Sequence, residues 1–283
     1  MCILSLTRNI ICFCCGFIKG QDIVLVIRGT WRRFHKVTEV HICRFKCFAP
    51  FLRILILRDV LIRGTFARED MPRNLKCFVS ANSSVPFAGG DMSSLNKLIQ
   101  VDIKSIVVDC EHESYNFPRA LQKLRLETPR ARGLRFLPEG NNLKLRELGL
   151  MSISAIHFRI SISPSLTKLV LQAITGLRNN LPGEMFKLRT LQSLSIRYCE
   201  HISVIPELQT EHLEYLYLAL PDLQTLPSSL QNLKNLRSLG QQYVAMFMCL
   251  LGSAYTPRSN LVSLSLLAGS GADSIPPKSQ VPP

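Results

Sequence analysis

Large apolar residues recur along most of the chain in the pattern LxxLxL, where x is any residue. The seven clear copies are LRILIL (52–57), LQKLRL (121–126), LRELGL (145–150), LTKLVL (166–171), LQSLSI (191–196), LEYLYL (213–218) and LVSLSL (261–266). Three weaker copies fill the gaps, and they are LKCFVS (75–80), LNKLIQ (95–100) and LRSLGQ (236–241). Successive copies begin 20 to 26 residues apart, so the chain repeats one structural unit.

Each copy predicts a short β-strand, because side chains alternate between the two faces of a strand. The fourth and sixth residues of the copy then enter the core, and the residues beside them point outward. Between copies, LPSSLQNLKNL (226–236) places leucines three and four residues apart, which predicts a short helical or 3-10 return path.

The repeat length is that of leucine-rich repeats. The expected fold is therefore an α/β leucine-rich-repeat solenoid of about ten coils. It has a curved parallel β-sheet on its concave face and short helical, 3-10 or irregular segments on its convex face.

The composition divides the chain into three segments. Residues 1–36 are an apolar, Cys-rich leader followed by a basic segment, residues 37–267 hold the repeats, and residues 268–283 form a Gly/Ser/Pro-rich tail. The apolar run at 10–18 is shorter than the roughly 20 residues that span a bilayer. The ten cysteines include one CxxC spacing, Cys12 to Cys15, but no second such pair, so we expect reduced thiols in a cytoplasmic protein rather than a zinc site.

The formal net charge of +14 is concentrated in the first half of the chain. Residues 1–141 carry 22 basic and 12 acidic side chains (+10), against 12 and 8 (+4) in residues 142–283. Such an excess can attract nucleic acid or anionic lipid. Without a nucleic-acid recognition motif, a solvated basic surface is the preferred interpretation, and no nucleic-acid partner is expected. Cys12, Cys14 and Cys15 lie beside the apolar run and could accept palmitate, which would tether the N-terminus to a membrane. The preferred interpretation of this run is a buried strand or a poorly ordered leader.

Two stretches resemble a known family. The patterns LxxLxIxxCxxIxxIP (191–206) and LPxxLxxLxxLxxL (226–239) look like the leucine-rich-repeat region of plant intracellular nucleotide-binding disease-resistance proteins. Residues 37–57 resemble the opening of that region, and the likeness covers roughly residues 37–240. No GxxxxGK[ST] phosphate loop is present, so the chain is similar to the sensor region alone and no nucleotide cofactor is implied.

The resemblance implies a non-catalytic module that binds a protein in plant defence. The implied partner is a pathogen effector, a guarded host protein or the nucleotide-binding part of a receptor. A cytosolic leucine-rich-repeat scaffold without an immune role and a membrane-tethered repeat protein remain alternative hypotheses. No small-molecule substrate, cofactor or metal is expected.

Cys199 and His201 are the pair that most resembles a catalytic centre. Cys199 is the ninth residue of its copy, where leucine-rich repeats place Asn or Cys to bond the backbone of the turn. No third group that would orient a base is evident, so we interpret Cys199 as structural.

The candidate binding residues are the outward-facing positions of four strands. They are Lys123, Arg125, Lys168, Ser193, Ser195, Arg197, Tyr215 and Tyr217. Solenoids bind partners on such concave surfaces, and Tyr and Arg are enriched at binding hot spots. The alternative interpretation is an unused surface in a degenerate repeat.

Overall fold

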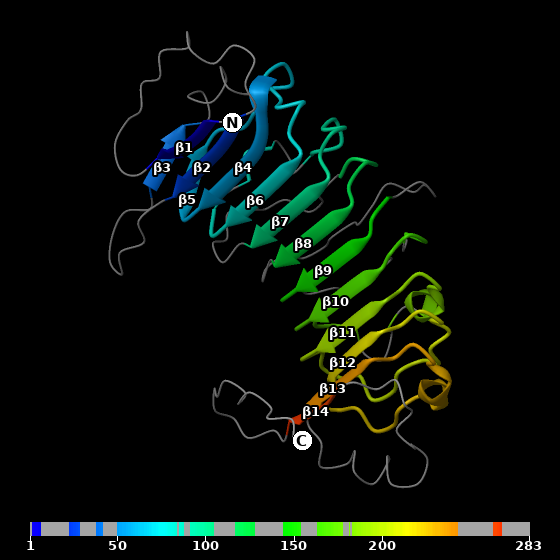
Figure 1. Ribbon diagram of the computed structural model, residues 1–283. Helices are drawn as coiled ribbons and strands as arrows, with labels where there is room; N and C mark the ends of the chain where they lie inside the picture. The colour runs from blue at the N-terminus through cyan, green and yellow to red at the C-terminus, as the bar shows by residue number, and fades with distance from the viewer. Residues whose placement is uncertain are drawn as a thin grey trace, which may run out of the picture.

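The computed structural model describes residues 2–6, 23–28, 38–41, 50–83, 85–87, 91–104, 117–127, 144–153, 163–177, 181, 183–242 and 263–267. These residues form a curved leucine-rich-repeat solenoid whose strands stack side by side in one continuous parallel sheet (Figure 1). The predicted fold class is confirmed by the strand pairing.

The main sheet has 12 strands, all of them paired in parallel. In spatial order they are β1 (Cys2–Leu6), β2 (Ile23–Arg28), β4 (Leu52–Arg58), β6 (Cys77–Ala81), β7 (Gln100–Lys104), β8 (Lys123–Glu127), β9 (Glu147–Met151), β10 (Lys168–Gln172), β11 (Ser193–Arg197), β12 (Tyr215–Ala219), β13 (Ser238–Gln242) and β14 (Ser263–Leu267). Ten of these, from β4 onward, correspond to the ten sequence repeats. The spatial order follows the chain order, as expected when each coil packs on the one before it.

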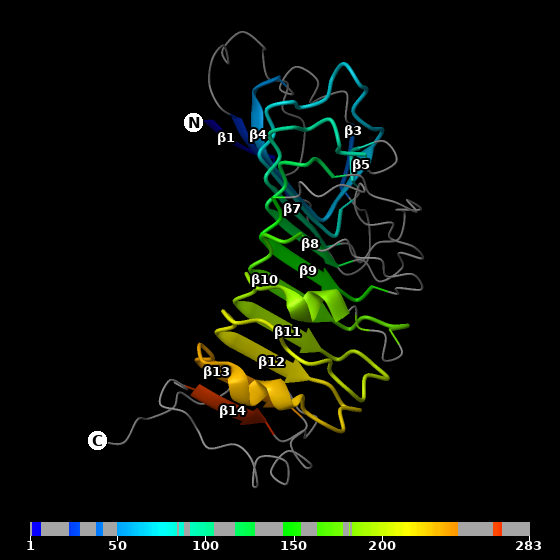
Figure 2. The ribbon, with the colours of Figure 1, turned by 90° about the vertical axis from the view of Figure 1, so that its right-hand side faces the viewer.

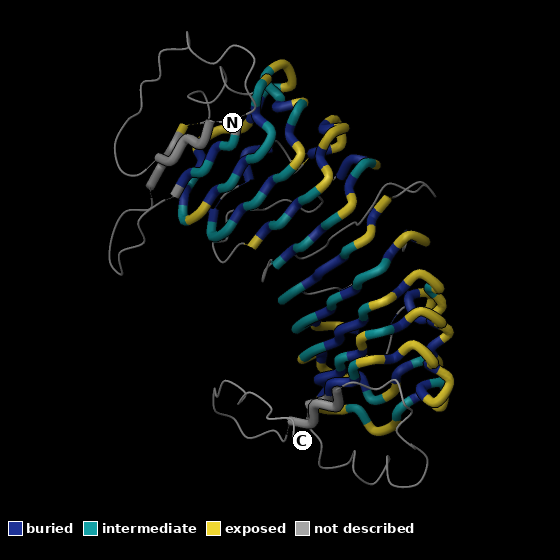
Figure 3. Tube along the Cα trace, in the orientation of Figure 1, coloured by how far each residue is buried: buried dark blue, intermediate teal, exposed yellow. Residues whose placement is uncertain are grey.

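The register of the sheet follows the repeat. Between β10 and β11, Leu169 pairs with Leu194, and Leu171 pairs with Ile196. All four side chains are buried, with at most 1% of their surface exposed. Burying such a side chain contributes about 1.5–3 kcal/mol, so the stacked leucines are the main stabilising term of the fold. Most exposed residues lie in the loops outside the sheet, whereas the strands carry mainly buried and intermediate residues (Figure 3).

The repeat assigned to residues 95–100 is out of frame by three residues. Strand β7 begins at Gln100, and its Val101 and Ile103 occupy the core positions that pair with those of β8. Leu98 therefore opens this coil. The Leu95 side chain is also buried, and the Leu95 carbonyl accepts the N–H of Leu98 in the turn before the strand. Counted from Leu98, the fourth and sixth residues are Val101 and Ile103, whereas the sixth residue counted from Leu95 is the polar Gln100. The frame that begins at Leu95 was therefore wrong, and the sequence itself favours Leu98.

The sheet begins before residue 37, where the repeat domain was expected to start. Strands β1 and β2 lie within the segment taken as a leader and extend the sheet from β4. By contrast, β3 (Thr38–His41), within the stretch that resembles the opening of the repeat region, pairs with β5 (Val60–Arg63) in a separate two-stranded sheet. The sequence missed β2 because IVLVIR is continuously apolar and lacks the leucine pattern. Cys12, Cys14, Cys15 and residues 268–283 lie outside the described residues.

The same turn geometry recurs at the end of successive strands. The residue after the strand has a positive φ in five coils, at Asp59, Asn82, Ser152, Ala173 and Tyr198. In each case its N–H donates to the carbonyl of the next coil, as Tyr198 does to Ala219 over 2.6 Å. A left-handed residue is costly for most side chains, so this shared conformation indicates that coil stacking overrides local preference.

Where the structure describes the return path on the convex side, it contains two short helices, η3 (Gly183–Lys187) and η4 (Ser228–Asn232). Figure 2 shows both helices beside the strands rather than within the sheet. Their buried side chains, Met185, Phe186 and Leu230, face the core. The 226–236 segment thus has the predicted 3-10 character. None of the helices in the described ranges is long and apolar enough to cross a membrane.

Candidate functional site

The outward-facing side chains form rows that cross the sheet, because equivalent residues pair from strand to strand. One row contains Ser195, Tyr217 and Gly240 of β11, β12 and β13, which are directly opposite one another. Neighbouring parallel strands lie about 4.8 Å apart, so side chains in one row contact each other. The repeat therefore brings together residues that lie more than 20 positions apart in the sequence.

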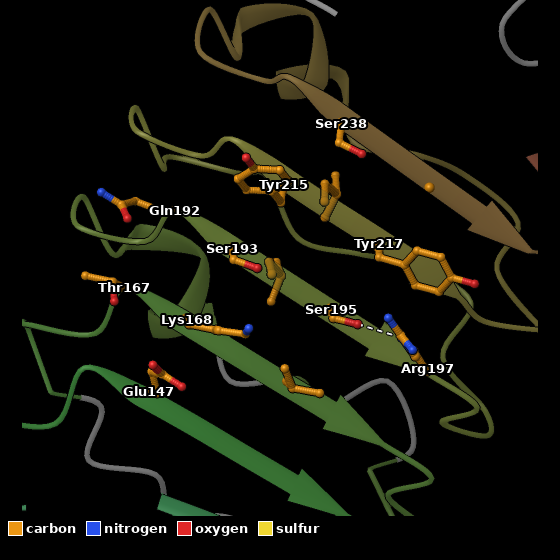
Figure 4. A pocket seen from close by; sticks show the side chains of 14 residues that line it. Glu147, Thr167, Lys168, Gln192, Ser193, Ser195, Arg197, Tyr215, Tyr217 and Ser238 are labelled. Atoms are coloured by element: carbon orange, nitrogen blue, oxygen red, sulfur yellow. Dashed lines mark hydrogen bonds between the residues drawn. The ribbon is translucent and has the colours of Figure 1, made fainter. Parts of the chain in front are cut away.

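A hollow of about 650 Å³ opens on this face over strands β10 to β13. Its lining residues are Glu147, Thr167, Lys168, Val170, Gln192, Ser193, Leu194, Ser195, Arg197, Tyr215, Leu216, Tyr217, Ser238 and Gly240. Figure 4 shows the labelled side chains of this set projecting from neighbouring strands on the same side of the sheet. Six of the eight predicted residues line the hollow. The other two, Lys123 and Arg125, do not.

Tyr217 is the best-held side chain of the hollow. The guanidinium carbon of Arg197 lies 4.2 Å from the centroid of the Tyr217 ring, a cation–π contact. The Nε of Arg197 donates to Ser195 Oγ over 2.9 Å, which fixes the guanidinium under the ring (Figure 4). On the other side the ring covers Gly240, where an added Cβ would lie 2.9 Å from Tyr217 Cε2 and closer still to Cδ2.

Tyr215 supplies the exposed aromatic surface of the hollow. Its side chain is 49% exposed, one of the largest exposed apolar surfaces in the described part of the chain. Ser193 lies opposite Tyr215 on β11, and Lys168 lies opposite Ser193 on β10. The row therefore runs from a cation through a hydroxyl to an aromatic ring.

Lys123 and Arg125 are held outside the hollow by Glu147. The Lys123 ammonium lies 3.0 Å from Glu147 Oε2, and an Arg125 terminal nitrogen lies 3.7 Å from the same oxygen. Beyond them, Asp102 lies opposite Arg125. Burial raises the pKa of the Asp102 carboxyl, and the charges of Arg125 and Lys123 act in the opposite direction. This part of the face is a network of mutually compensated charges.

Three residues of this face were not identified from the sequence. Glu147 occupies the same repeat position as Lys123 and Lys168, so the repeat pattern itself could have found it. Asp102 was missed because of the frame error in its coil. Gly240 gives no signal in the sequence, since its role depends on the ring of a neighbouring strand.

Cys199 is structural, as predicted. Its side chain is fully buried, and its Sγ donates to the Arg197 carbonyl over 3.4 Å. Burial raises the pKa of the thiol, and backbone hydrogen bonds with Ile174, Arg197 and Ala173 partly offset this. His201 is exposed and its backbone N–H donates to Asp222, so thiol and imidazole are not arranged as nucleophile and base. Within the described ranges, no group of three or more His, Cys, Asp or Glu residues could hold a metal ion.

Comparison with known proteins found a match among solved structures but none among protein-family models or curated proteins. Among solved structures, a leucine-rich-repeat protein of Leptospira interrogans is similar, with 19% sequence identity and a TM-score of 0.49. The similarity covers 78% of this chain and 54% of that one, so this chain spans about half of that protein's length. The fold assignment rests on the strand pairing and register of the chain itself.

Proposed function

We propose that this chain is a non-catalytic recognition module that binds a partner protein on its concave face, over strands β10 to β13. The observation that carries the proposal is the hollow in which Tyr217 is held between Arg197 and Gly240. A ring that is already fixed loses little conformational freedom on binding, and Tyr and Arg are the side chains that dominate protein interfaces. The concave face of a solenoid supplies the extended area that a protein ligand needs.

In its finer form, the proposal is a role in plant defence and innate immunity. The chain would act in the cytoplasm as the sensor region of a disease-resistance receptor. Its partner would be a pathogen effector, a guarded host protein or the nucleotide-binding part of a receptor. The support for this role is the resemblance of residues 191–206 and 226–239 to such receptors.

The binding surface is tested by comparing captured partners. The full chain and a Tyr215→Ala/Tyr217→Ala variant serve as baits in proximity labelling. We expect the variant to lose the partners of the wild type, whereas Glu184→Ala/Gln231→Ala, on the exposed surfaces of η3 and η4, keeps them. Unchanged partners for the tyrosine variant would remove this surface from consideration.

A second variant separates binding from folding. Gly240→Ala introduces a Cβ where the Tyr217 ring now lies, so the ring must shift away from its present position. We expect Gly240→Ala to lose the same partners while circular dichroism still shows a cooperative melting transition. Gly149→Ala is the matched control, since its Cβ would approach only Arg125 Cγ, at 3.3 Å.

A further inference from the structure

The cations on the concave face fall into two groups. Lys123 and Arg125 both form ion pairs with Glu147, so the charges of all three side chains already have partners. Lys168 and Arg197 both line the hollow, yet neither forms an ion pair within the described part of the chain. Two positive charges thus face the hollow, and within the described residues neither lies within ion-pair distance of a carboxylate, although Glu147 is opposite Lys168.

Arg197 is also oriented for a ligand. A guanidinium has five N–H donors, and Arg197 uses the one on Nε for Ser195. The guanidinium carbon lies over the Tyr217 ring, and the two terminal nitrogens of Arg197 form no ion pair within the described residues. No hydrogen bond to those nitrogens is present among the described residues. The edge of a guanidinium that carries both terminal nitrogens binds a carboxylate through two parallel hydrogen bonds.

We propose that the hollow selects an acidic, extended peptide segment of its partner. One carboxylate pairs with Arg197 through both terminal nitrogens, a second pairs with Lys168, and apolar atoms between them lie on Tyr215 and Tyr217. This inference rests on the proposed function, because it names the chemistry of the ligand at that surface. Lys168 lies opposite Ser193 on the adjacent strand, and Arg197 is four residues beyond Ser193. The Cα atoms of Lys168 and Arg197 are therefore about 14 Å apart. Two acidic side chains on one extended segment can span that distance.

Charge complementarity favours a peptide over a nucleic acid. Glu147 borders the hollow, and Asp102 and Glu127 lie farther along the same face. Glu127 and Glu147 are paired with Lys104, Lys123 and Arg125, so the face beyond the hollow offers few uncompensated cations to a phosphate backbone that followed the sheet. A short peptide with two carboxylates needs only Lys168 and Arg197, and its flanking residues need carry no charge.

The test uses acetylated, amidated decapeptides with one tyrosine and two glutamates placed one to five residues apart, and the same peptides with glutamine. Affinity for the full chain is measured by fluorescence polarisation at low and high salt. We expect at least one glutamate peptide to bind, with at least tenfold weaker binding for its glutamine counterpart and for Lys168→Gln/Arg197→Gln. The matched control, Lys187→Gln/Arg189→Gln, removes the same charge from an exposed segment outside the hollow and retains binding.

Arg197→Lys distinguishes geometry from charge. It keeps the positive charge but cannot form the paired hydrogen bonds, so we expect the same tenfold weakening. Equal binding by the double glutamine variant, no binding by any glutamate peptide, or tighter binding of a single-stranded oligonucleotide would each overturn the inference. If captured partners still depend on Tyr215 and Tyr217 in that case, the proposed function stands and only the acidic ligand is rejected.

Discussion

Single side chains link successive coils at the ninth position of the repeat. Ser83 Oγ accepts the N–H of Val60, one coil earlier, and donates to the Ala81 carbonyl two residues back. Cys199 repeats the second of these bonds with the Arg197 carbonyl. A hydroxyl and a thiol thus perform the role that asparagine usually has in these repeats, because each both donates and accepts.

Thr210 differs from these two residues in the hydrogen bonding of its side chain. Its side chain is fully buried, and its hydroxyl has no hydrogen-bond partner among the described residues. An unsatisfied buried hydroxyl costs about 1–3 kcal/mol, so Thr210→Val, which keeps the shape, should raise the free energy of unfolding by about 1 kcal/mol. Urea unfolding followed by circular dichroism measures the change.

Thr190→Val is the matched control for Thr210. The Thr190 hydroxyl lies 2.7 Å from the Pro164 carbonyl oxygen and 2.8 Å from that of Leu166. Its replacement should lower stability, since both carbonyls lose a donor. A lower stability for Thr210→Val, or equal effects of the two substitutions, would show that burial of the hydroxyl at position 210 carries no penalty.

At the scale of the element, a side chain of one coil caps the short helix of the next coil. The carboxylate of Glu207 accepts the N–H groups of Ser228 and Ser229 at the start of η4, over 3.2 and 2.8 Å. Helix N-termini leave such N–H groups without partners, and an acceptor there stabilises the helix. The sequence predicted the 3-10 segment from its leucines, but not its cap, because Glu207 precedes η4 by 21 residues.

Glu207 makes the stability of this element depend on pH. Hydrogen bonds from Ser229 and Ser228 lower the pKa of the Glu207 carboxyl below its ordinary value. A lowered pKa in the folded state contributes stability that is present above the unfolded pKa and is lost as pH falls through the folded pKa. Glu207→Gln should therefore be less stable than the wild type at neutral pH and should lose less stability on acidification.

Melting temperatures measured from neutral to acidic pH test the role of Glu207. Glu184→Gln is the control, because it removes an exposed carboxylate that bonds only Lys187 within η3. Parallel pH profiles for wild type and Glu207→Gln would contradict a capping role.

At the scale of the whole molecule, the solenoid has one continuous core shared between neighbours. Each buried leucine contacts the equivalent residues of the coils before and after it, so stability is the sum of coil and interface contributions. The β7 coil illustrates this dependence: Val101 and Ile103, the fourth and sixth residues counted from Leu98, pair with buried residues of both neighbouring strands.

Leu171→Ala tests how far a defect spreads. Leu171 is fully buried in β10, and its truncation should cost about 2–5 kcal/mol. We expect amide hydrogen exchange to accelerate most in β9, β10 and β11, and less in β4 and β6. Val170→Ala, on the outward face of the same strand, should have a smaller effect. Uniform acceleration throughout the sheet would indicate a single cooperative unit instead.

The sequence by itself determined the repeat, the outward positions and most of the candidate surface, because a strand has a fixed period of two and a coil has a nearly fixed length. Six of the eight predicted residues line the hollow for that reason. The tertiary structure alone decided which outward side chains are neutralised and which remain available. Glu147 forms ion pairs with Lys123 and Arg125. Gly240 has no Cβ, which leaves room for the Tyr217 ring that packs on Arg197. These contacts join different coils, and their distances are set by how the coils stack rather than by any local pattern.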